Sequence, residues 1–309
     1  MEAKSTGALE PAAGVAAGSI ASSAVQTARA YIALTKPRII SLLLLTTVAA
    51  MIVADPSGPS AAIVLWTMLG GYLAAGGAGA INHYIDRDLD ARMSRTSSRP
   101  LVSGRIDPRR GLAFGIALGA AAVVQLSLTV NVLAAGLSLL GLLGYVFVYT
   151  MWLKPLTPQN IVIGGAAGAV PPLVGWAAAT GGLAPEAFYL FAIVFFWTPP
   201  HFWALSLLIK DDYARSGVPM LPVVRGEDAT RRQILIYSLV LLGVTLAPVA
   251  GGLLGAIYAV TALALGGLFV AWAERLLAKP SRRSALRLYL YSLLYLAILF
   301  TAMAVDRVA

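Results

Sequence analysis

Long apolar stretches are the feature that most constrains this chain of 309 residues. A helix rises about 1.5 Å per residue, so the roughly 30 Å apolar core of a bilayer takes about 20 consecutive apolar residues. The sequence holds nine such stretches, at about 39–54, 61–81, 111–130, 132–150, 159–179, 186–208, 232–252, 256–274 and 286–304. We therefore predict an all-α integral membrane protein with nine transmembrane helices.

The placement of the basic residues tests this count. The chain has 23 Lys and Arg against 14 Asp and Glu, and a net charge of +9 taken alone would suggest nucleic acid as a partner. With nine spans and a cytoplasmic N-terminus, 22 of the 23 basic residues fall in cytoplasmic segments and only Arg307 lies outside. Such an excess is typical of cytoplasmic loops of membrane proteins. We expect a cytoplasmic N-terminus, an outer C-terminus, membrane lipid as a partner and no nucleic acid.

The N-terminal segment lacks the features of a span or a targeting signal. It has no apolar run of 18 residues, and Glu2 and Glu10 against Arg29 disfavour a mitochondrial transit peptide. The absence of cysteine excludes disulfides and thiolate metal sites. We expect a flexible cytoplasmic tail over residues 1–30, a single nine-helix domain over 31–309, and a bacterial inner (cytoplasmic) membrane as the location.

Two polar segments on the predicted cytoplasmic side, 82–110 and 209–232, hold the candidate chemistry. Asn82, Asp86 and Asp90 are spaced four apart, which places them on one face of a helix. Hard oxygen donors suit Mg²⁺, which binds through one or two carboxylates while substrate phosphates fill other positions. The alternative is an ordinary charged helix end at the membrane surface, and these three residues alone do not decide between the two.

Arginines close to this acidic ladder favour a binding site. Arg92, Arg95 and Arg99 follow within ten residues of the carboxylates, and Arg95 and Arg99 are again four apart. Guanidinium groups make bidentate contacts to phosphate. The tendency of cytoplasmic loops to be basic explains arginines in general, but not their mixture with an acidic ladder. The segment therefore predicts a diphosphate-sized metal site.

The second segment again mixes acids and cations. Asp211 and Asp212 are adjacent and cannot share one helical face, and we favour Asp212. The segment would hold a second metal or the other side of a diphosphate. Lys210 and Arg215 are equally well explained as anchors at the membrane interface.

One histidine lies among aromatic residues. His201 follows Pro199-Pro200, which we expect to kink or end the sixth span. The surrounding aromatic residues are Phe195, Phe196, Trp197, Phe202 and Trp203. They suit a pocket for a flat apolar ligand, although the residues alone favour an aromatic belt at the interface.

These motifs resemble a known family. The ladder followed by Arg95-Thr96-x-x-Arg99-Pro100-Leu101-x-x-Gly104 is similar to the first signature of the intramembrane prenyltransferases of UbiA type. Further segments from residue 34 to about 226 resemble the haem-modifying branch of that family. They are Leu34-Thr35-Lys36-Pro37-Arg38, Tyr149-Thr150, Leu153-Lys154, Thr157-Pro158-Gln159-Asn160, Pro171-Pro172-x-x-Gly175-Trp176, His201-Phe202-Trp203 and Asp212-Tyr213.

The resemblance implies a fold and an activity. It implies nine helices around a central cavity that opens toward the cytoplasm. It implies Mg²⁺-dependent transfer of farnesyl from farnesyl diphosphate to a vinyl group of haem B, giving haem O for haem-copper oxidases. A haem A synthase or an oxidase assembly factor is the expected partner. The alternatives are a prenyltransferase of the same fold that acts on a quinone precursor or chlorophyllide, and a membrane protein that binds or transports haem without catalysis.

The resemblance also implies roles for individual residues. The expected catalytic residues are Asn82, Asp86, Asp90, Arg95, Arg99 and Asp212, and the expected metal ligands are Asn82, Asp86, Asp90 and Asp212. The expected substrate contacts are Lys36, Arg38, Lys154, Asn160, His201, Lys210, Tyr213 and Arg215. Arg215 and Ser216 follow Asp212-Tyr213 where quinone-type relatives have further aspartates, so the number of metal ions stays open.

Overall fold

Helices make up nearly all of the described chain. The computed structural model describes residues 13–309, with side chains from residue 24 onward. The elements are α1 (Ala13–Thr35), α2 (Pro37–Ala54), α3 (Ala61–Ile85), α4 (Arg87–Asp90), α5 (Pro108–Thr129), α6 (Val132–Leu143), the π-helix η1 (Gly144–Leu153), α7 (Lys154–Leu156), α8 (Asn160–Gly168), α9 (Val170–Thr180), α10 (Ala187–Leu208), α11 (Lys210–Ser216), α12 (Leu221–Val224), α13 (Gly226–Ala250), α14 (Ala256–Ala278) and α15 (Arg282–Val308).

Nine helical stretches of the described chain are long and apolar enough to cross a membrane. Most are single helices, while Val132–Leu156 joins α6, η1 and α7, and Asn160–Thr180 joins α8 and α9. The predicted all-α, nine-span architecture is confirmed, and the chain is a multi-pass membrane protein. The orientation of its termini stays a prediction. The largest differences lie at polar ends, where the fourth span continues to Leu156 and α13 begins at Gly226.

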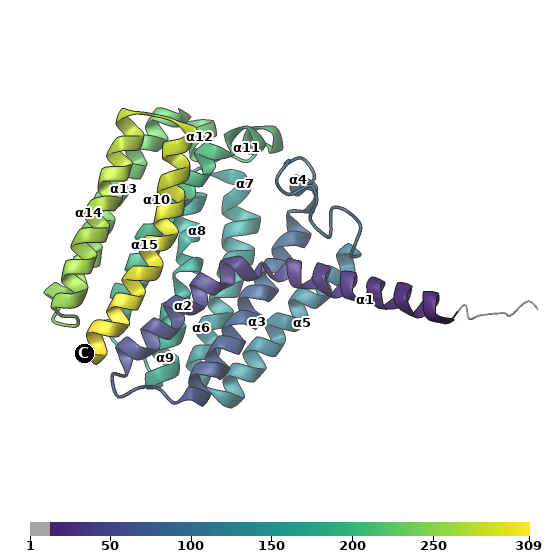
Figure 1. The fold of residues 1–309 in the computed structure, drawn as a ribbon, viewed down its shortest axis with the longest axis horizontal. Coiled ribbons are helices and arrows are strands. Elements are labelled where there is room, and N and C mark those ends of the chain that lie inside the picture. The colour runs from purple at the N-terminus through teal and green to yellow at the C-terminus, as the bar shows by residue number, and fades with distance from the viewer. Residues whose placement is uncertain (1–12) are drawn as a thin grey trace, which may run out of the picture.

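The helices form one bundle whose polar segments gather at one end. Figure 1 shows α13, α14 and α15 on one side of the bundle and α3 and α5 on the other. α10 lies between them and packs against α13 and α15, while α2 packs against α9. The short helices α4, α11 and α12 lie at the same end (Figure 1). We call this the polar end of the bundle, and the segments around 82–110 and 209–232 meet there.

The sixth span does not end at its two prolines. α10 runs from Ala187 to Leu208 with Pro199 and Pro200 inside it. The pair was expected to kink or end the helix; it does not end it, and the kink stays a prediction. Membrane helices tolerate proline because neighbouring helices, hydroxyl side chains and local backbone adjustments satisfy the freed backbone groups. The result is that His201 continues the same helix and lies buried against α15.

The N-terminal tail expected over residues 1–30 is helical in its described part. Residues 1–12 lie outside the described residues, and α1 covers Ala13–Thr35. Alanine, the best helix former, is frequent in this segment. Ala30 and Leu34 are buried in a cluster with Ala80 and Leu101, so the last turns of α1 belong to the folded bundle. The division of the chain at residue 30 otherwise stays a prediction.

Candidate active site

The acidic ladder lies where α3 passes into α4. The amide of Asp86 donates to the Asn82 carbonyl at 2.9 Å, and the amide of Asp90 donates to the Asp86 carbonyl at 2.7 Å. These are helical i to i−4 bonds, so the break between α3 and α4 leaves the three side chains on one face. All three are buried, with Asp90 only 2% exposed. The predicted helical ladder is thus present in the structure.

Each member of the ladder contacts one cation from elsewhere in the chain. Lys154 Nζ lies 2.5 Å from Asp86 Oδ2, and Arg99 Nη1 lies 2.6 Å from Asp90 Oδ2. Lys36 Nζ donates to Asn82 Oδ1 at 2.7 Å. Buried carboxylates need such partners, because an unpaired buried charge is strongly unfavourable. Three segments distant in sequence therefore converge on one polar cluster.

The cation before the first span is placed by an unusual backbone conformation. Lys36 has φ 57° and ψ 54° and is the one non-glycine residue with positive φ in the described chain. The following Pro37 begins α2, and a residue before proline is disfavoured in the right-handed helical region. Left-handed backbone at a bulky residue is typical of functional sites. Burial, followed by the positive charge of Arg99, lowers the pKa of Lys36 to about 7.

A π-helix shapes the wall opposite the ladder. η1 carries Tyr145 and Thr150 and ends just before Lys154. Because π-helical bonds join residues five apart, residues spaced four to five apart along η1 share a face. Asn82 Nδ2 donates to Thr150 Oγ1 at 3.1 Å and to Asp86 Oδ2 at 2.7 Å. Thr150 of the π-helix thus contacts Asn82, and Lys154, the first residue after it, contacts Asp86.

The loop after α4 is tied to α11. Ser94 Oγ donates to both carboxylate oxygens of Asp212, at 2.9 and 3.0 Å, and the Arg95 amide donates at 3.5 Å. Arg215 also pairs with Asp212. Burial opposes the charge of Asp212, but the donors from Ser94 and Arg95 hold its pKa below the ordinary value. Asp212 therefore fixes the arginine-bearing loop to α11.

The next residue of α11 faces the same cluster. Tyr213 is buried, with 7% of its surface exposed. Burial raises the pKa of its phenol, and the nearby positive charges of Arg95 and Arg99 oppose that rise. The second polar segment thus contributes Asp212 and Tyr213 to the site that the first segment begins.

An apolar cavity opens from this cluster. Lys36, Thr35 and Tyr145 line its polar end, and the Lys36 ammonium lies 5.8 Å from the centre of the Tyr145 ring. The remaining walls come from apolar and small residues of α2, α3, α6, α8 and α9. The arrangement suits a ligand with an anionic head and a long apolar chain.

Two buried polar atoms beside the cluster lack a protein partner. They are His83 Nδ1, adjacent to Asn82, and Asn160 Oδ1. The Asn160 amide also donates to the Lys154 carbonyl at 3.5 Å, which places it next to the cation that pairs with Asp86. Unsatisfied buried polar atoms are rare and call for an explanation such as a ligand.

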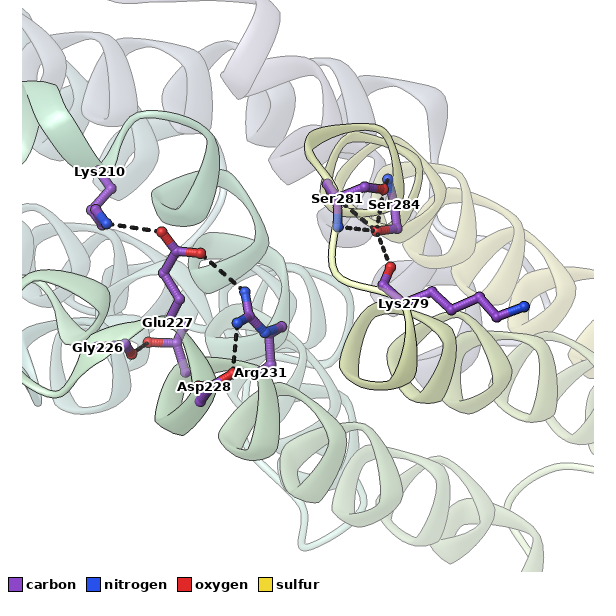
Figure 2. A network of polar contacts seen from close by, with 9 residues as sticks. Lys210, Gly226, Glu227, Asp228, Arg231, Lys279, Ser281 and Ser284 are labelled. Carbon is purple, nitrogen blue, oxygen red and sulfur yellow. Dashed lines mark hydrogen bonds and ion pairs between the residues drawn. The ribbon is translucent and has the colours of Figure 1, made fainter.

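Three of the expected substrate contacts lie away from the cluster. Arg38 is exposed. The Lys210 ammonium instead pairs with Glu227 at 2.8 Å, and Glu227 also pairs with Arg231 at 3.0 Å (Figure 2). The Glu227 hydrogen bond raises the pKa of Lys210. This network joins the start of α11 to the start of α13 and does not contact the ladder.

His201 is the third. Its ring stacks on Trp197 at 4.3 Å and on Tyr289 at 5.0 Å between ring centroids, and Nδ1 lies 2.7 Å from Ser292 Oγ. Both ring faces are therefore covered by other rings. This packing explains the histidine as part of the α10–α15 interface, and its expected contact with haem stays a prediction.

Comparison with known proteins decides the family. The model of the UbiA prenyltransferase family matches residues 43–299, which is most of the chain. The chain belongs to the UbiA prenyltransferase family. A protein of Roseiflexus sp. (strain RS-1) named protoheme IX farnesyltransferase is 58% identical over 278 residues, which cover 90% of this chain and 52% of that protein. A Streptomyces avermitilis protein of the same name is 51% identical over 285 residues, covering 90% and 93%.

This UbiA-family chain spans about half the length of the first of these relatives. Solved structures share its fold. A digeranylgeranylglyceryl phosphate synthase has a TM-score of 0.75 at 17% identity, covering 91% of this chain and 99% of that one. A UbiA homolog from Archaeoglobus fulgidus bound to DMAPP and Mg²⁺ has a TM-score of 0.63 at 18% identity, covering 89% and 99%. The family resemblance inferred from the motifs is confirmed.

In this family member, sequence reasoning missed several residues of the cluster. Ser94 carried no signal, because a loop serine is common and its partner lies 118 positions away. Thr150 and Tyr145 belong to an apolar span whose π-helical register is not visible in the sequence. Among these residues, only Thr150 belonged to a segment, Tyr149-Thr150, that resembles the family in sequence. These side chains are recognisable as site residues only once the helices are assembled.

Proposed function

We propose that the chain is a Mg²⁺-dependent prenyltransferase that transfers farnesyl from farnesyl diphosphate to a vinyl group of haem B, giving haem O. One observation carries the proposal. Two buried carboxylates, Asp86 and Asp90, form a cluster with Arg99, Lys154 and, through Asn82, Lys36, and Lys36 lines the polar end of an apolar cavity. The anionic head of an allylic diphosphate matches the cluster, and its prenyl chain matches the cavity.

The ladder fits Mg²⁺ by the chemistry of its donors. It offers two carboxylates and an amide oxygen, and no further His, Cys, Asp or Glu joins them in a metal-binding group within the described part of the chain. Mg²⁺ typically takes one or two carboxylates and completes its coordination with water and substrate phosphates. Asn82, Asp86 and Asp90 would hold the ion. When bound, it would supply positive charge that stabilises the diphosphate leaving group.

The cations of the cluster have roles of their own. Lys36, Lys154 and Arg99 now contact the ladder, and a bound diphosphate would bring them new anionic partners. Donors placed in advance toward a developing charge stabilise the transition state without reorganisation. We assign to them, with Arg95, the binding and orientation of the diphosphate. Asp212 would position the loop that carries Arg95 and Arg99, and its role as a metal ligand stays a prediction.

The proposed reaction balances without a redox partner. The C1–O bond of the allylic diphosphate breaks, and its electron pair leaves with the diphosphate. The terminal carbon of the haem vinyl group forms a bond to C1, which leaves a cation on the carbon next to the porphyrin. Water adds to that carbon and loses a proton, giving a hydroxyethylfarnesyl side chain. The apolar cavity walls exclude water from the allylic cation until the new C–C bond has formed.

The choice of acceptor rests on the relatives. Proteins 51–58% identical to this chain carry the name protoheme IX farnesyltransferase. We also propose the bacterial cytoplasmic membrane as the location, with the polar end of the bundle facing the cytoplasm. The concentration of basic residues in the segments at that end supports this orientation. A haem A synthase or an oxidase assembly factor would then receive the product.

A labelling experiment tests the proposal. Membranes containing the protein are incubated with haem B, labelled farnesyl diphosphate and Mg²⁺, and the labelled product is identified by mass spectrometry. A farnesylated haem is the expected result. A labelled quinone precursor or chlorophyllide would contradict the acceptor, and haem binding without transfer would contradict catalysis.

A further inference from the structure

We propose that the crossing of α2 and α9 at Thr47 and Gly175 forms the floor of the prenyl cavity and limits the donor to a chain of farnesyl length. The inference rests on the proposed function, because it takes the apolar cavity as the site of the prenyl chain. Nothing in the sequence motifs reports the depth of this cavity.

The cavity runs along α2 and α3 away from the polar end. Lys36 lines its mouth and Thr47 its deep end, eleven residues further along α2, which is about 16 Å at 1.5 Å per residue. On α3, Gly79 and Gly71 line the same walls, eight residues or about 12 Å apart. The length available to a chain below the cation cluster is therefore about 12–16 Å.

Two helix backbones approach each other closely at the deep end. A Cβ added to Gly175 would lie 2.2 Å from the Thr47 carbonyl oxygen, so α2 and α9 touch there without an intervening side chain. Val174, the neighbour of Gly175, lines the cavity and packs with Met51 in a buried cluster just beyond it. A ligand can displace the tip of a flexible side chain, but it cannot separate helices in backbone contact at similar cost. The floor is therefore rigid.

The length of the cavity matches one donor. In an extended chain each C–C bond of about 1.5 Å advances the end by about 1.25 Å, so the backbone of a farnesyl chain spans about 14 Å. By the same rule a geranyl chain spans about 9 Å and a geranylgeranyl chain about 19 Å. Farnesyl fills the space above the floor, geranyl leaves some of it empty, and geranylgeranyl meets the floor.

One wall residue allows the depth to be changed without touching the catalytic cluster. Gly168 lines the cavity, and a Cβ added to it would meet no atom within 4 Å. It lies six residues before Val174, or about 9 Å above the floor along the span. A larger side chain at this position would therefore project into the cavity and shorten it rather than collide with protein.

The test compares wild type with Gly168→Leu and with a matched control. Gly136→Leu makes the same change at an exposed position of α6 that does not line the cavity, where an added Cβ also meets no atom within 4 Å. kcat/KM is measured with dimethylallyl, geranyl, farnesyl and geranylgeranyl diphosphate, with Mg²⁺ and haem B present. Because a single methylene changes specificity about 10- to 200-fold, wild type and control should prefer farnesyl over geranylgeranyl at least about tenfold. Leucine at position 168 would leave about 3–7 Å of the cavity above it, which fits a dimethylallyl group of about 4 Å but neither a geranyl nor a farnesyl chain. Gly168→Leu should therefore prefer dimethylallyl over farnesyl by at least about tenfold.

The outcomes separate the two proposals. If wild type consumes none of the four diphosphates, the proposed function fails. If wild type transfers farnesyl but uses geranylgeranyl equally well, or if Gly168→Leu keeps the wild-type order of donors, the floor is refuted while the proposed function stands. Retained activity with dimethylallyl diphosphate shows that the variant is folded. If Gly168→Leu does not accumulate, Ser138→Leu fills the cavity from α6 and must also lower kcat/KM for farnesyl relative to dimethylallyl diphosphate.

Discussion

Replacing Asp86 by asparagine separates the proposed metal role of the ladder from its role in an ion pair. The Asp86 carboxylate accepts from Lys154 at 2.5 Å and from Asn82 at 2.7 Å, and its side chain is 7% exposed. Loss of a preorganised electrostatic contact in an active site typically costs about 10²- to 10³-fold in rate. We expect Asp86→Asn to lower kcat/KM for farnesyl transfer at least about 100-fold and to raise the Mg²⁺ concentration needed for half-maximal activity.

The same change leaves Lys154 buried without its anionic partner. Removal of one partner of a buried pair destabilises a protein by about 3–5 kcal/mol, so inactivation through misfolding must be distinguished from loss of a ligand. The double variant Asp86→Asn, Lys154→Met removes the unpaired charge. Its thermal unfolding midpoint should recover most of the loss caused by Asp86→Asn, while activity should not recover.

Asp88 provides the matched control. It lies two residues from Asp86, pairs only with Arg87 among the described ion pairs, and its side chain is 79% exposed. The hydrogen bond from Arg87, followed by the charge of Arg87, lowers the pKa of Asp88. Asp88→Asn should leave kcat/KM within about threefold of wild type. Activity of Asp86→Asn above a tenth of wild type, at unchanged Mg²⁺ dependence, would refute the metal role.

Four further substitutions test individual contacts of the site. Lys36→Met should raise KM for farnesyl diphosphate about 10- to 100-fold, because it removes an ammonium that already lies beside the ladder. Arg38→Met is the control and should change KM little, because Arg38 is exposed and lies away from the cluster. If steady-state kinetics show equal effects of the two substitutions, Lys36 has no special role in diphosphate binding. Ser94→Ala should lower the thermal unfolding midpoint by a few degrees, as both hydroxyl bonds to Asp212 are lost, and an unchanged melting curve would show that the loop is held by other contacts. Lys210→Met should leave kcat/KM within about threefold, and a loss above tenfold would return Lys210 to the diphosphate site.

Much of the fold follows from local composition. Nine apolar stretches of spanning length predict nine helices because only a helix or a closed barrel satisfies backbone groups inside a bilayer. The boundaries were least predictable where polar residues extend a helix beyond the apolar run, as Glu227 and Arg231 do at the start of α13. Pro199 and Pro200 of α10 show a second limit of prediction from sequence. The rule that proline ends a helix holds for isolated helices, but in a membrane bundle neighbouring helices satisfy the carbonyl groups that proline leaves free.

The candidate site likewise has a part that could be predicted from the sequence and a part that could not. Asn82, Asp86 and Asp90 share a face because helical periodicity is local, and this portion of the site could be predicted from their spacing alone. His201 and Lys210 illustrate the opposite case. Their residue types fit a substrate site, but stacking on Trp197 and Tyr289 and pairing with Glu227 depend on which helices become neighbours.

Nine membrane crossings, the concentration of cations in the segments at one end, and an acidic ladder among those cations can all be predicted from the order of the amino acids. These properties depend on hydrophobicity and on spacing within one helix. Only the tertiary structure decided which cation meets which ladder residue, because the left-handed backbone at Lys36 and the π-helix before Lys154 set those directions. It also decided the depth of the cavity, since the contact of Thr47 with Gly175 depends on how closely two helices pack.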